Sequence, residues 1–167
     1  MSLDELYREV IMDHYRSPRH WGRLTEATDS VHLHNPLCGD DITLDLMIED
    51  GRIKEVGFEG KGCSISQASA SLMAESIAGK STAEAVRLLK RFRNMMKGAP
   101  AGDDEVTAEA AAEAGADAEA EADAEDLGDL EALSGVVKFP VRIKCAVLPW
   151  EALRKAIAPE LNIADDF

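Results

Sequence analysis

The stretch Asp41-Ile-Thr-Leu-Asp-Leu-Met-Ile48 alternates between apolar and polar side chains, and Glu49-Asp-Gly51 follows it directly. Alternation places every second side chain on one face of a strand, and Asp-Gly is typical of a two-residue hairpin turn. The run Ile53-Lys-Glu-Val-Gly-Phe-Glu-Gly60 has the composition of the returning strand, and Val31-His-Leu-His34 that of a preceding one. The sequence therefore predicts a three-stranded antiparallel meander with one apolar face that helices must cover.

Helices are predicted both before and after these strands in the sequence. They share apolar side chains at helical spacing and comprise residues 3–15, 64–78, 81–96 and 149–157. Ser81-Thr-Ala-Glu84 has the pattern of a capping box, and Pro18 and Gly79 are typical of residues that follow a helix. The predicted fold class is α+β: a small three-stranded antiparallel sheet with an N-terminal helix and C-terminal helices packed on it.

The chain of 167 residues has the length of one domain, but its charge is unevenly distributed. Residues 97–135 hold 13 of the 32 acidic residues and one base, a net charge of −12, whereas the rest of the chain has a net charge of −2. We expect a single domain over residues 1–158, interrupted by a solvated acidic insertion at 97–135 that is disordered or a fraying helix. Residues 159–167 are expected to form a tail.

Composition excludes several classes of protein. The acidic balance argues against a nucleic-acid partner, and no apolar run approaches the roughly 20 residues that span a bilayer. The N-terminus is acidic and amphipathic, unlike a secretory signal, so we expect a cytoplasmic protein. Three cysteines cannot all pair internally, which favours metal binding or thiol chemistry over a disulfide framework.

The three cysteines occur in marked settings. They lie in Asn35-Pro-Leu-Cys-Gly-Asp40, in Gly60-Lys-Gly-Cys63 and in Phe139-Pro-Val-Arg-Ile-Lys-Cys145, each expected at the end of a strand or helix. Zinc is typically four-coordinate and favours thiolate sulfur, with carboxylate or imidazole as further ligands. We therefore predict that one metal ion is bound by four side chains, Cys38, Asp40, Cys63 and Cys145.

Other interpretations of these residues remain open from the sequence. Three cysteines can be buried apolar residues, or they can belong to a closed structural zinc site. His34 is a competing ligand near Cys38. Asp40 is preferred to Asp41 because, if Asp41 begins the strand facing away, only Asp40 shares a side with Cys38.

Three blocks together resemble the SufU group of the IscU/NifU-like iron–sulfur cluster assembly proteins. They are Asn35-Pro-Leu-Cys-Gly-Asp40, Gly60-Lys-Gly-Cys-Ser-Ile-Ser-Gln-Ala-Ser69 and Phe139-Pro-Val-Arg-Ile-Lys-Cys-Ala146, and Leu6 to Pro18 also looks like that group. The resemblance covers about residues 3–96 and 136–158. It implies the small α+β fold predicted above, and the family's ligand positions fall on the four residues already named.

The resemblance implies a zinc-containing sulfur acceptor, sulfurtransferase-like, that takes the outer sulfur of a persulfide from a SufS-type cysteine desulfurase and serves a downstream cluster assembly scaffold. Cys38 is the expected acceptor and Cys145 the second choice, with Arg142 available to steer a persulfide anion or to pair with Asp40 or a partner.

Two alternatives are kept. One is a scaffold that binds iron or a nascent [2Fe–2S] cluster, and against it stands Lys144, where IscU-type scaffolds have a histidine. The other is a structural zinc module whose acidic arm binds partners.

Overall fold

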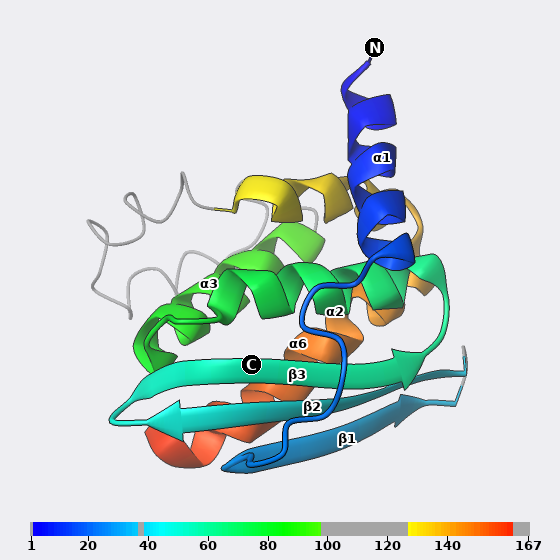
Figure 1. The fold of residues 1–167 in the computed structure, drawn as a ribbon. Coiled ribbons are helices and arrows are strands. Elements are labelled where there is room, and N and C mark those ends of the chain that lie inside the picture. Colours follow the sequence, from blue (N-terminus) through cyan, green and yellow to red (C-terminus); the bar gives the residue numbers. More distant parts are fainter. Residues whose placement is uncertain (1, 37–38, 98–126, 162–167) are drawn as a thin grey trace, which may run out of the picture.

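The structure, a computed structural model, describes residues 2–36, 39–97 and 127–161. Its helices and strands are, in chain order, α1 (Leu3–Arg16), β1 (Asp29–Asn35), β2 (Asp40–Glu49), β3 (Arg52–Lys61), α2 (Ser64–Ile77), α3 (Thr82–Met96), the 3-10 helix η1 (Gly128–Lys138) and α6 (Pro140–Leu161). Figure 1 shows the three strands as one layer with the helices gathered on one side of it. The predicted α+β fold with an N-terminal helix and C-terminal helices is confirmed.

The sheet has the order β1-β2-β3, and both pairs of strands are antiparallel. The β2–β3 turn is formed by Asp50 and Gly51, which both have positive φ, 52° and 73°. A type I′ turn, whose twist matches that of the two strands, requires positive φ at both central residues. Glycine adopts this conformation without steric cost. The meander predicted from residues 31–60 is therefore confirmed.

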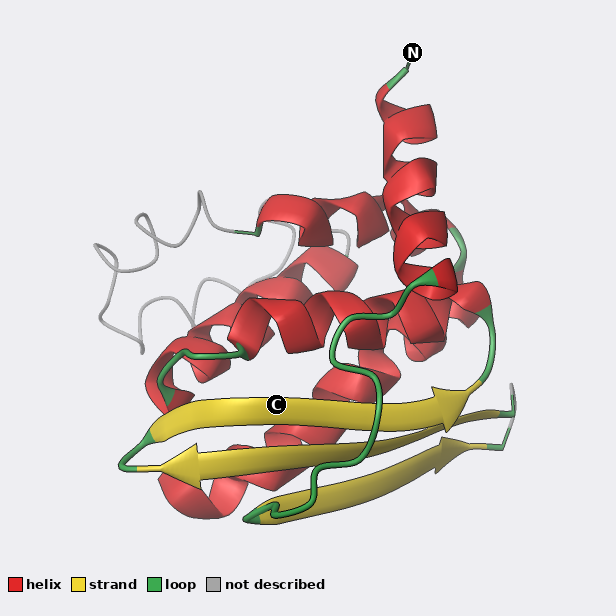
Figure 2. Cartoon of the chain, viewed as in Figure 1, coloured by secondary structure: helices red, strands yellow, loops and turns green. Residues whose placement is uncertain are grey.

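One face of the sheet forms the core together with the helices. The side chains of β2 that alternate toward this face are buried, namely Ile42, Leu44, Leu46 and Ile48. Figure 2 shows the helices on this side, where α6 contacts β1 and β2 and α2 contacts β3. The rings of Phe92 on α3 and Trp150 on α6 stack with their centroids 4.5 Å apart. Large apolar side chains from strands and helices thus share one continuous core.

The segment 17–28 runs from α1 across the sheet to β1 (Figure 2). Trp21 packs edge-on against Phe58 with ring centroids 5.4 Å apart, although it is itself about half exposed at 49%. Arg23 forms an ion pair with Asp45, whose carboxylate is buried on this side of β2. The crossing segment therefore packs on Phe58 at the edge of the sheet and covers the buried carboxylate of Asp45.

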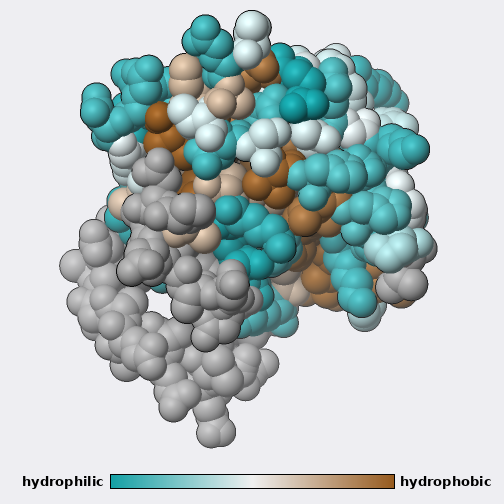
Figure 3. Space-filling view, turned by 90° about the horizontal axis from the view of Figure 1, so that it is seen from below, coloured by the Kyte–Doolittle hydropathy of each residue, from teal (hydrophilic) through white to brown (hydrophobic). Residues whose placement is uncertain are grey.

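Apolar side chains are also found on the molecular surface. Figure 3 shows a band of them flanked by polar side chains on the face seen from below. Among the described residues, the large apolar side chains that are exposed are Leu6, Tyr15, Trp21, Phe139 and Val141. Nowhere in the described residues is a helix both long enough and apolar enough to cross a bilayer.

The helix ends follow the sequence signals closely. α3 begins with the predicted capping box, in which the Glu84 backbone N–H donates to Ser81 Oγ at 3.1 Å and the Ser81 N–H donates to Glu84 Oε1 at 2.9 Å. α2 begins at Ser64 as predicted, and Gly79, with φ of 82°, follows its end. These two helices are thus set by local residues rather than by packing alone.

The C-terminal helix differs from the prediction of a helix over residues 149–157. α6 begins nine residues earlier, at Pro140, and continues through Pro149. Proline at the first position of a helix costs nothing because its missing N–H would have no partner there. Proline inside a helix usually ends or kinks it, but the buried packing of Trp150 and neighbouring residues compensates here.

The acidic insertion predicted over residues 97–135 falls largely on residues 98–126, which lie outside the described residues, so that prediction stays a prediction. Its last part is described. The chain enters η1 at Gly128, and Leu130 and Leu133 of that helix are almost fully buried. The last residues of the predicted insertion, from Gly128 onward, are therefore packed. The predicted tail lies in part within α6, and residues 162–167 lie outside the described residues.

Candidate metal centre

Three of the four predicted ligands lie together in the structure. Asp40 begins β2, Cys63 is the N-cap residue of α2, and Cys145 lies in α6. The metal-binding atoms of these three side chains all lie within 4.8 Å of one another. The residues are far apart in the sequence, so this meeting depends on the packing of β2, α2 and α6 against one another.

The Asp40 carboxylate is fully buried, and its two oxygens differ in their surroundings. Oδ1 accepts a hydrogen bond of 3.1 Å from the backbone N–H of Cys63. Oδ2 is buried and has no hydrogen-bond partner among the described residues. A buried carboxylate oxygen without a partner is costly, and a divalent cation beside it removes that cost. The site therefore has the chemistry of a metal site, with a carboxylate oxygen still available next to two thiols.

A glycine beside Cys63 makes this arrangement possible. Gly62 has φ of 147°, and a Cβ placed on it would overlap Asp40 Oδ1 and lie 2.7 Å from Ser66 Oγ. Ser66 in turn donates a hydrogen bond of 3.1 Å from Oγ to the carbonyl of Cys63. The Gly-Lys-Gly pattern before Cys63 was visible in the sequence, but the need for Gly62 is apparent only once Asp40 is seen beside it.

Cys145 is buried, with 2% of its surface exposed. The expectation that it lies at the end of a strand or helix is wrong, because α6 begins five residues before it. Its position is set by contacts between α2 and α6, in which Ser69 Oγ donates to the Ala146 carbonyl at 2.6 Å and accepts from Trp150 Nε1 at 3.1 Å. Ser69 therefore fixes the residue next to Cys145, a role that sequence reasoning did not find.

Cys38 lies outside the described residues, so its place in the ligand set stays a prediction. The described residues on either side of it are informative. Asn35 and Asp40 pair across β1 and β2, and the Gly39 N–H donates to the Asn35 carbonyl at 2.8 Å. Gly39 has φ of 73°, which favours glycine. In the sequence, Cys38 precedes Gly39 and lies two residues before Asp40.

Asp40 and Asp41 point to opposite sides of the sheet, as strand alternation predicts. Asp41 is partly exposed, and its carboxylate lies 2.9 Å from His32 Nε2 and 3.6 Å from His34 Nδ1. His34, the competing ligand, is not among the described residues whose metal-binding atoms cluster with Cys63. This leaves Asp40 as the carboxylate on the side of the thiols.

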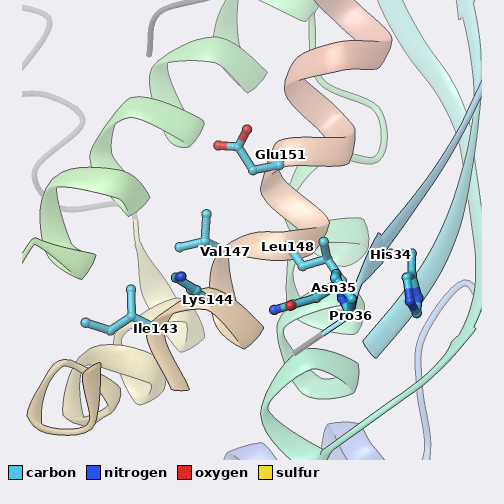
Figure 4. A pocket seen from close by; sticks show the side chains of 8 residues that line it. All are labelled: His34, Asn35, Pro36, Ile143, Lys144, Val147, Leu148 and Glu151. Carbon is cyan, nitrogen blue, oxygen red and sulfur yellow. The ribbon is translucent and has the colours of Figure 1, made fainter. Parts of the chain in front are cut away.

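A pocket of about 450 Å³ lies between the end of β1 and α6. Figure 4 shows His34, Asn35 and Pro36 on one side of it and α6 residues, among them Lys144 and Glu151, on the other. Arg142 is exposed near the start of α6 and, among the described ion pairs, none joins it to Asp40. The two basic residues before Cys145 are thus on the surface rather than within the ligand cluster.

Two thiols and one carboxylate form a donor set that suits zinc, which takes such ligands in tetrahedral geometry. With three donors from the described residues, one position remains for a fourth ligand. The arrangement can hold a metal ion and can also present a thiol for sulfur exchange, because Cys63 is only half buried.

Comparison with known proteins gives a consistent family. The chain is 45% identical over 159 residues to the zinc-dependent sulfurtransferase SufU of Bacillus subtilis (strain 168), covering 95% of this chain and 94% of that protein. It is 38% identical to the iron–sulfur cluster assembly scaffold protein IscU of Streptococcus pyogenes serotype M1, covering 96% and 87%.

A crystal structure from Fervidobacterium islandicum AW-1, described as a candidate cluster assembly scaffold of the SUF system, aligns with a TM-score of 0.71 and 33% identity over 93% of this chain and 98% of that one. The family model of the NifU-like N-terminal domain matches residues 6–125. The fold, the clustered thiols and these matches agree, and the chain belongs to the NifU-like N-terminal domain family.

Proposed function

We propose that this protein is a zinc-dependent sulfurtransferase of iron–sulfur cluster assembly, which accepts persulfide sulfur from a SufS-type cysteine desulfurase and delivers it to a downstream cluster assembly scaffold. The observation that carries the proposal is the buried, unpartnered Asp40 Oδ2 beside the thiols of Cys63 and Cys145. The similarity over nearly the whole chain to a protein named as a zinc-dependent sulfurtransferase supports the same conclusion.

In this proposal Asp40, Cys63 and Cys145 hold the ion, with Cys38 as the fourth ligand. Zinc, when bound, keeps its cysteine ligands deprotonated at neutral pH. The Cys63 N–H holds Asp40 in position through Oδ1, so that Oδ2 remains the coordinating oxygen. Second-shell contacts of this kind orient a ligand, and their loss weakens metal binding.

The transfer step is a thiol exchange. The thiolate of Cys38 attacks the outer sulfur of the desulfurase persulfide, a new S–S bond forms on Cys38, and the desulfurase cysteine leaves as a thiolate. No net oxidation or reduction occurs, since one S–S bond replaces another. Cys38 is the preferred acceptor because its sequence neighbours include Pro36 and Gly39, which favour a loop, whereas Cys63 caps α2 and Cys145 is buried in α6.

The pocket between β1 and α6 adjoins Cys145 through Lys144, the residue before it, and we take it as the approach to the site. Its α6 lining consists of apolar side chains with Lys144 and Glu151, and Arg142 is exposed one turn before Cys145. A persulfide at neutral pH is an anion, so two cations near the approach favour its arrival. Cys145 remains the second choice of acceptor because it follows directly after these cations.

The test is the turnover of a SufS-type cysteine desulfurase with cysteine, measured as alanine formed, with and without this protein. We expect strong stimulation by the wild type and none by Cys38→Ala, with the desulfurase still bound in calorimetry. Glu59→Gln, an exposed change on β3, is the control and should stimulate like the wild type. A desulfurase that is indifferent to the wild-type protein would contradict the proposal.

The second candidate function is a scaffold for a nascent [2Fe–2S] cluster, favoured by the 38% identity to a protein named IscU scaffold. Lys144 precedes Cys145 at the surface, and a protonated lysine has no lone pair to donate to iron. Metal analysis after anaerobic purification separates the two candidates. Colourless protein with about one zinc per chain supports transfer, and brown protein with iron and sulfide supports the scaffold.

A further inference from the structure

A second group of metal-binding side chains lies away from the thiols. It consists of His14 on α1, Glu75 on α2 and Asp129 on η1, whose nearest ligand atoms all lie within 4.8 Å of one another. Glu75 follows Cys63 by twelve residues along α2, which corresponds to about 18 Å at the rise of an α-helix. The group is therefore separate from the site of sulfur transfer, and nothing proposed above uses it.

The imidazole of His14 is buried and oriented toward the carboxylates. Its side chain is 3% exposed, and Nδ1 lies 2.7 Å from Ser71 Oγ, which also accepts a hydrogen bond of 2.8 Å from the Arg19 backbone N–H. Nε2 lies 3.8 Å from Glu75 Oε1, too far for a hydrogen bond. Histidine ligands in proteins are commonly held in this way, with one ring nitrogen fixed by a hydrogen bond and the other directed at the metal.

The two carboxylates of this group have few ion-pair partners among the described residues. Within the described residues, Glu75 has one ion-pair partner, His14, and Asp129 has none. Burial lowers the pKa of His14 and nearby Arg19 lowers it further, effects that Glu75 and Asp129 oppose without reversing. The lowered pKa favours the neutral imidazole, which is the form that binds metals.

The group has access to solvent. Glu75 is about half exposed, at 50%, and with Asp129 it lines a pocket of about 250 Å³. Three basic side chains, Lys80, Arg87 and Arg91, line the same pocket. Among the described residues, the ion pair of Glu75 is with His14 rather than with Lys80 or Arg91. The pocket leaves room for water molecules at the remaining coordination positions of an ion.

We propose that His14, Glu75 and Asp129 form a second metal site that binds a first-row divalent cation such as Mn²⁺, with water completing its coordination. A donor set of one imidazole and two carboxylates, with no thiolate, favours a harder metal ion than the thiol site favours. A bound ion links α1, α2 and the start of η1, and so fixes the chain where it resumes after residues 98–126.

The test uses the full chain with its thiol site first loaded with one equivalent of zinc. Mn²⁺ is then added, because it prefers oxygen and nitrogen donors and does not compete well for thiolates. Free Mn²⁺ is measured by electron paramagnetic resonance, and broadening of the His14 ring protons is followed by NMR. We expect one tight Mn²⁺ per chain and selective broadening of His14 below one equivalent.

The test variant carries both Glu75→Gln and Asp129→Asn. The control is Glu131→Gln, which lies on η1 like Asp129, and all three positions are exposed. The double variant should lose the tight site and the broadening, and the control should keep both. With free Mn²⁺ a hundredfold above its Kd, the wild-type Tm should rise by about 5–10 °C. Equal Mn²⁺ binding by all three proteins, as expected of the acidic insertion alone, or no broadening of His14, would overturn the proposal.

Discussion

The backbone N–H of Cys63 donates a hydrogen bond of 3.1 Å to Oδ1 of Asp40, a residue 23 positions earlier in the chain. This bond ties the beginning of β2 to the beginning of α2, and it orients the carboxylate so that Oδ2 remains unpartnered. The backbone of one proposed ligand, Cys63, therefore positions the side chain of another, Asp40. Perturbations that leave the fold intact but move this contact should affect metal binding more than stability.

Gly62→Ala is such a perturbation. A Cβ at this residue would overlap Asp40 Oδ1, so we expect zinc affinity to fall by tenfold or more, roughly the effect of losing a contact that orients a ligand. Gly79→Ala is the control, because Gly79 also has positive φ but has nothing within 4 Å of an added Cβ. Competition with a chromophoric chelator measures the affinity. Equal affinity in the two variants would show that Asp40 does not depend on Gly62.

Ser69→Ala tests the link between α2 and α6. The change leaves the Trp150 Nε1–H and the Ala146 carbonyl without their partner in a buried place, which should cost about 2 kcal/mol in the free energy of unfolding. Urea unfolding measures this cost. Ser76→Ala, which removes a bond from Oγ to the Leu72 carbonyl within α2, should cost less. A loss no greater than that of Ser76→Ala would mean that Ser69 does not hold the two helices together.

Asp45 should make stability depend on pH. Burial raises the pKa of its carboxyl, but hydrogen bonds from Arg23, Ser30 and the Leu24 N–H outweigh this, and the net pKa lies below the ordinary 3.8. A lowered folded-state pKa stabilises the protein above the unfolded value, and this contribution disappears as pH falls through the folded pKa.

Asp45→Asn should therefore lower the free energy of unfolding by about 2 kcal/mol at pH 7, and the difference from wild type should shrink below about pH 4. Urea unfolding at pH 7, 5 and 3 measures it, with the exposed change Glu55→Gln as control. A difference as large at pH 3 as at pH 7 would contradict this assignment.

The acidic insertion should be dispensable for folding up to the start of η1. We expect replacement of residues 100–126 by a short Gly/Ser linker to leave the melting temperature and zinc content nearly unchanged, because its sequence has no apolar stripe. Leu130→Ala should instead cost about 2–4 kcal/mol, since Leu130 is 1% exposed. Calorimetry of both variants tests the boundary, and a large fall in Tm on replacing residues 100–126 would show that they are packed.

The sheet and most helices could be predicted because their signals are local. Alternation along β2, the Asp50-Gly51 turn and the capping box of Ser81 and Glu84 each act within a few residues. The start of α6 could not be predicted in this way. Pro149 indicates a helix boundary by local rules, whereas burial of the surrounding helix against the sheet and α2 overrides them.

The residue types of the candidate site could be predicted from the sequence. The residues that hold its ligands in position could not. Cysteines beside a glycine or a lysine, and an aspartate near one of them, indicated Asp40, Cys63 and Cys145. The roles of Gly62 and Ser69 depend on neighbours 22 and 77 residues away, so no local pattern could reveal them. The same holds for His14, which in sequence is one more apolar-face position of the first helix.

The proposed function depends on a single zinc ion held by Cys38, Asp40, Cys63 and Cys145. X-ray absorption at the zinc edge of the purified protein tests it most directly, because it counts the atoms bound to the metal. We expect three sulfurs at about 2.3 Å and one oxygen at about 2.0–2.2 Å, and two sulfurs in Cys38→Ala. A zinc ion surrounded only by nitrogen and oxygen, or a sulfur count that Cys38→Ala leaves unchanged, would contradict it.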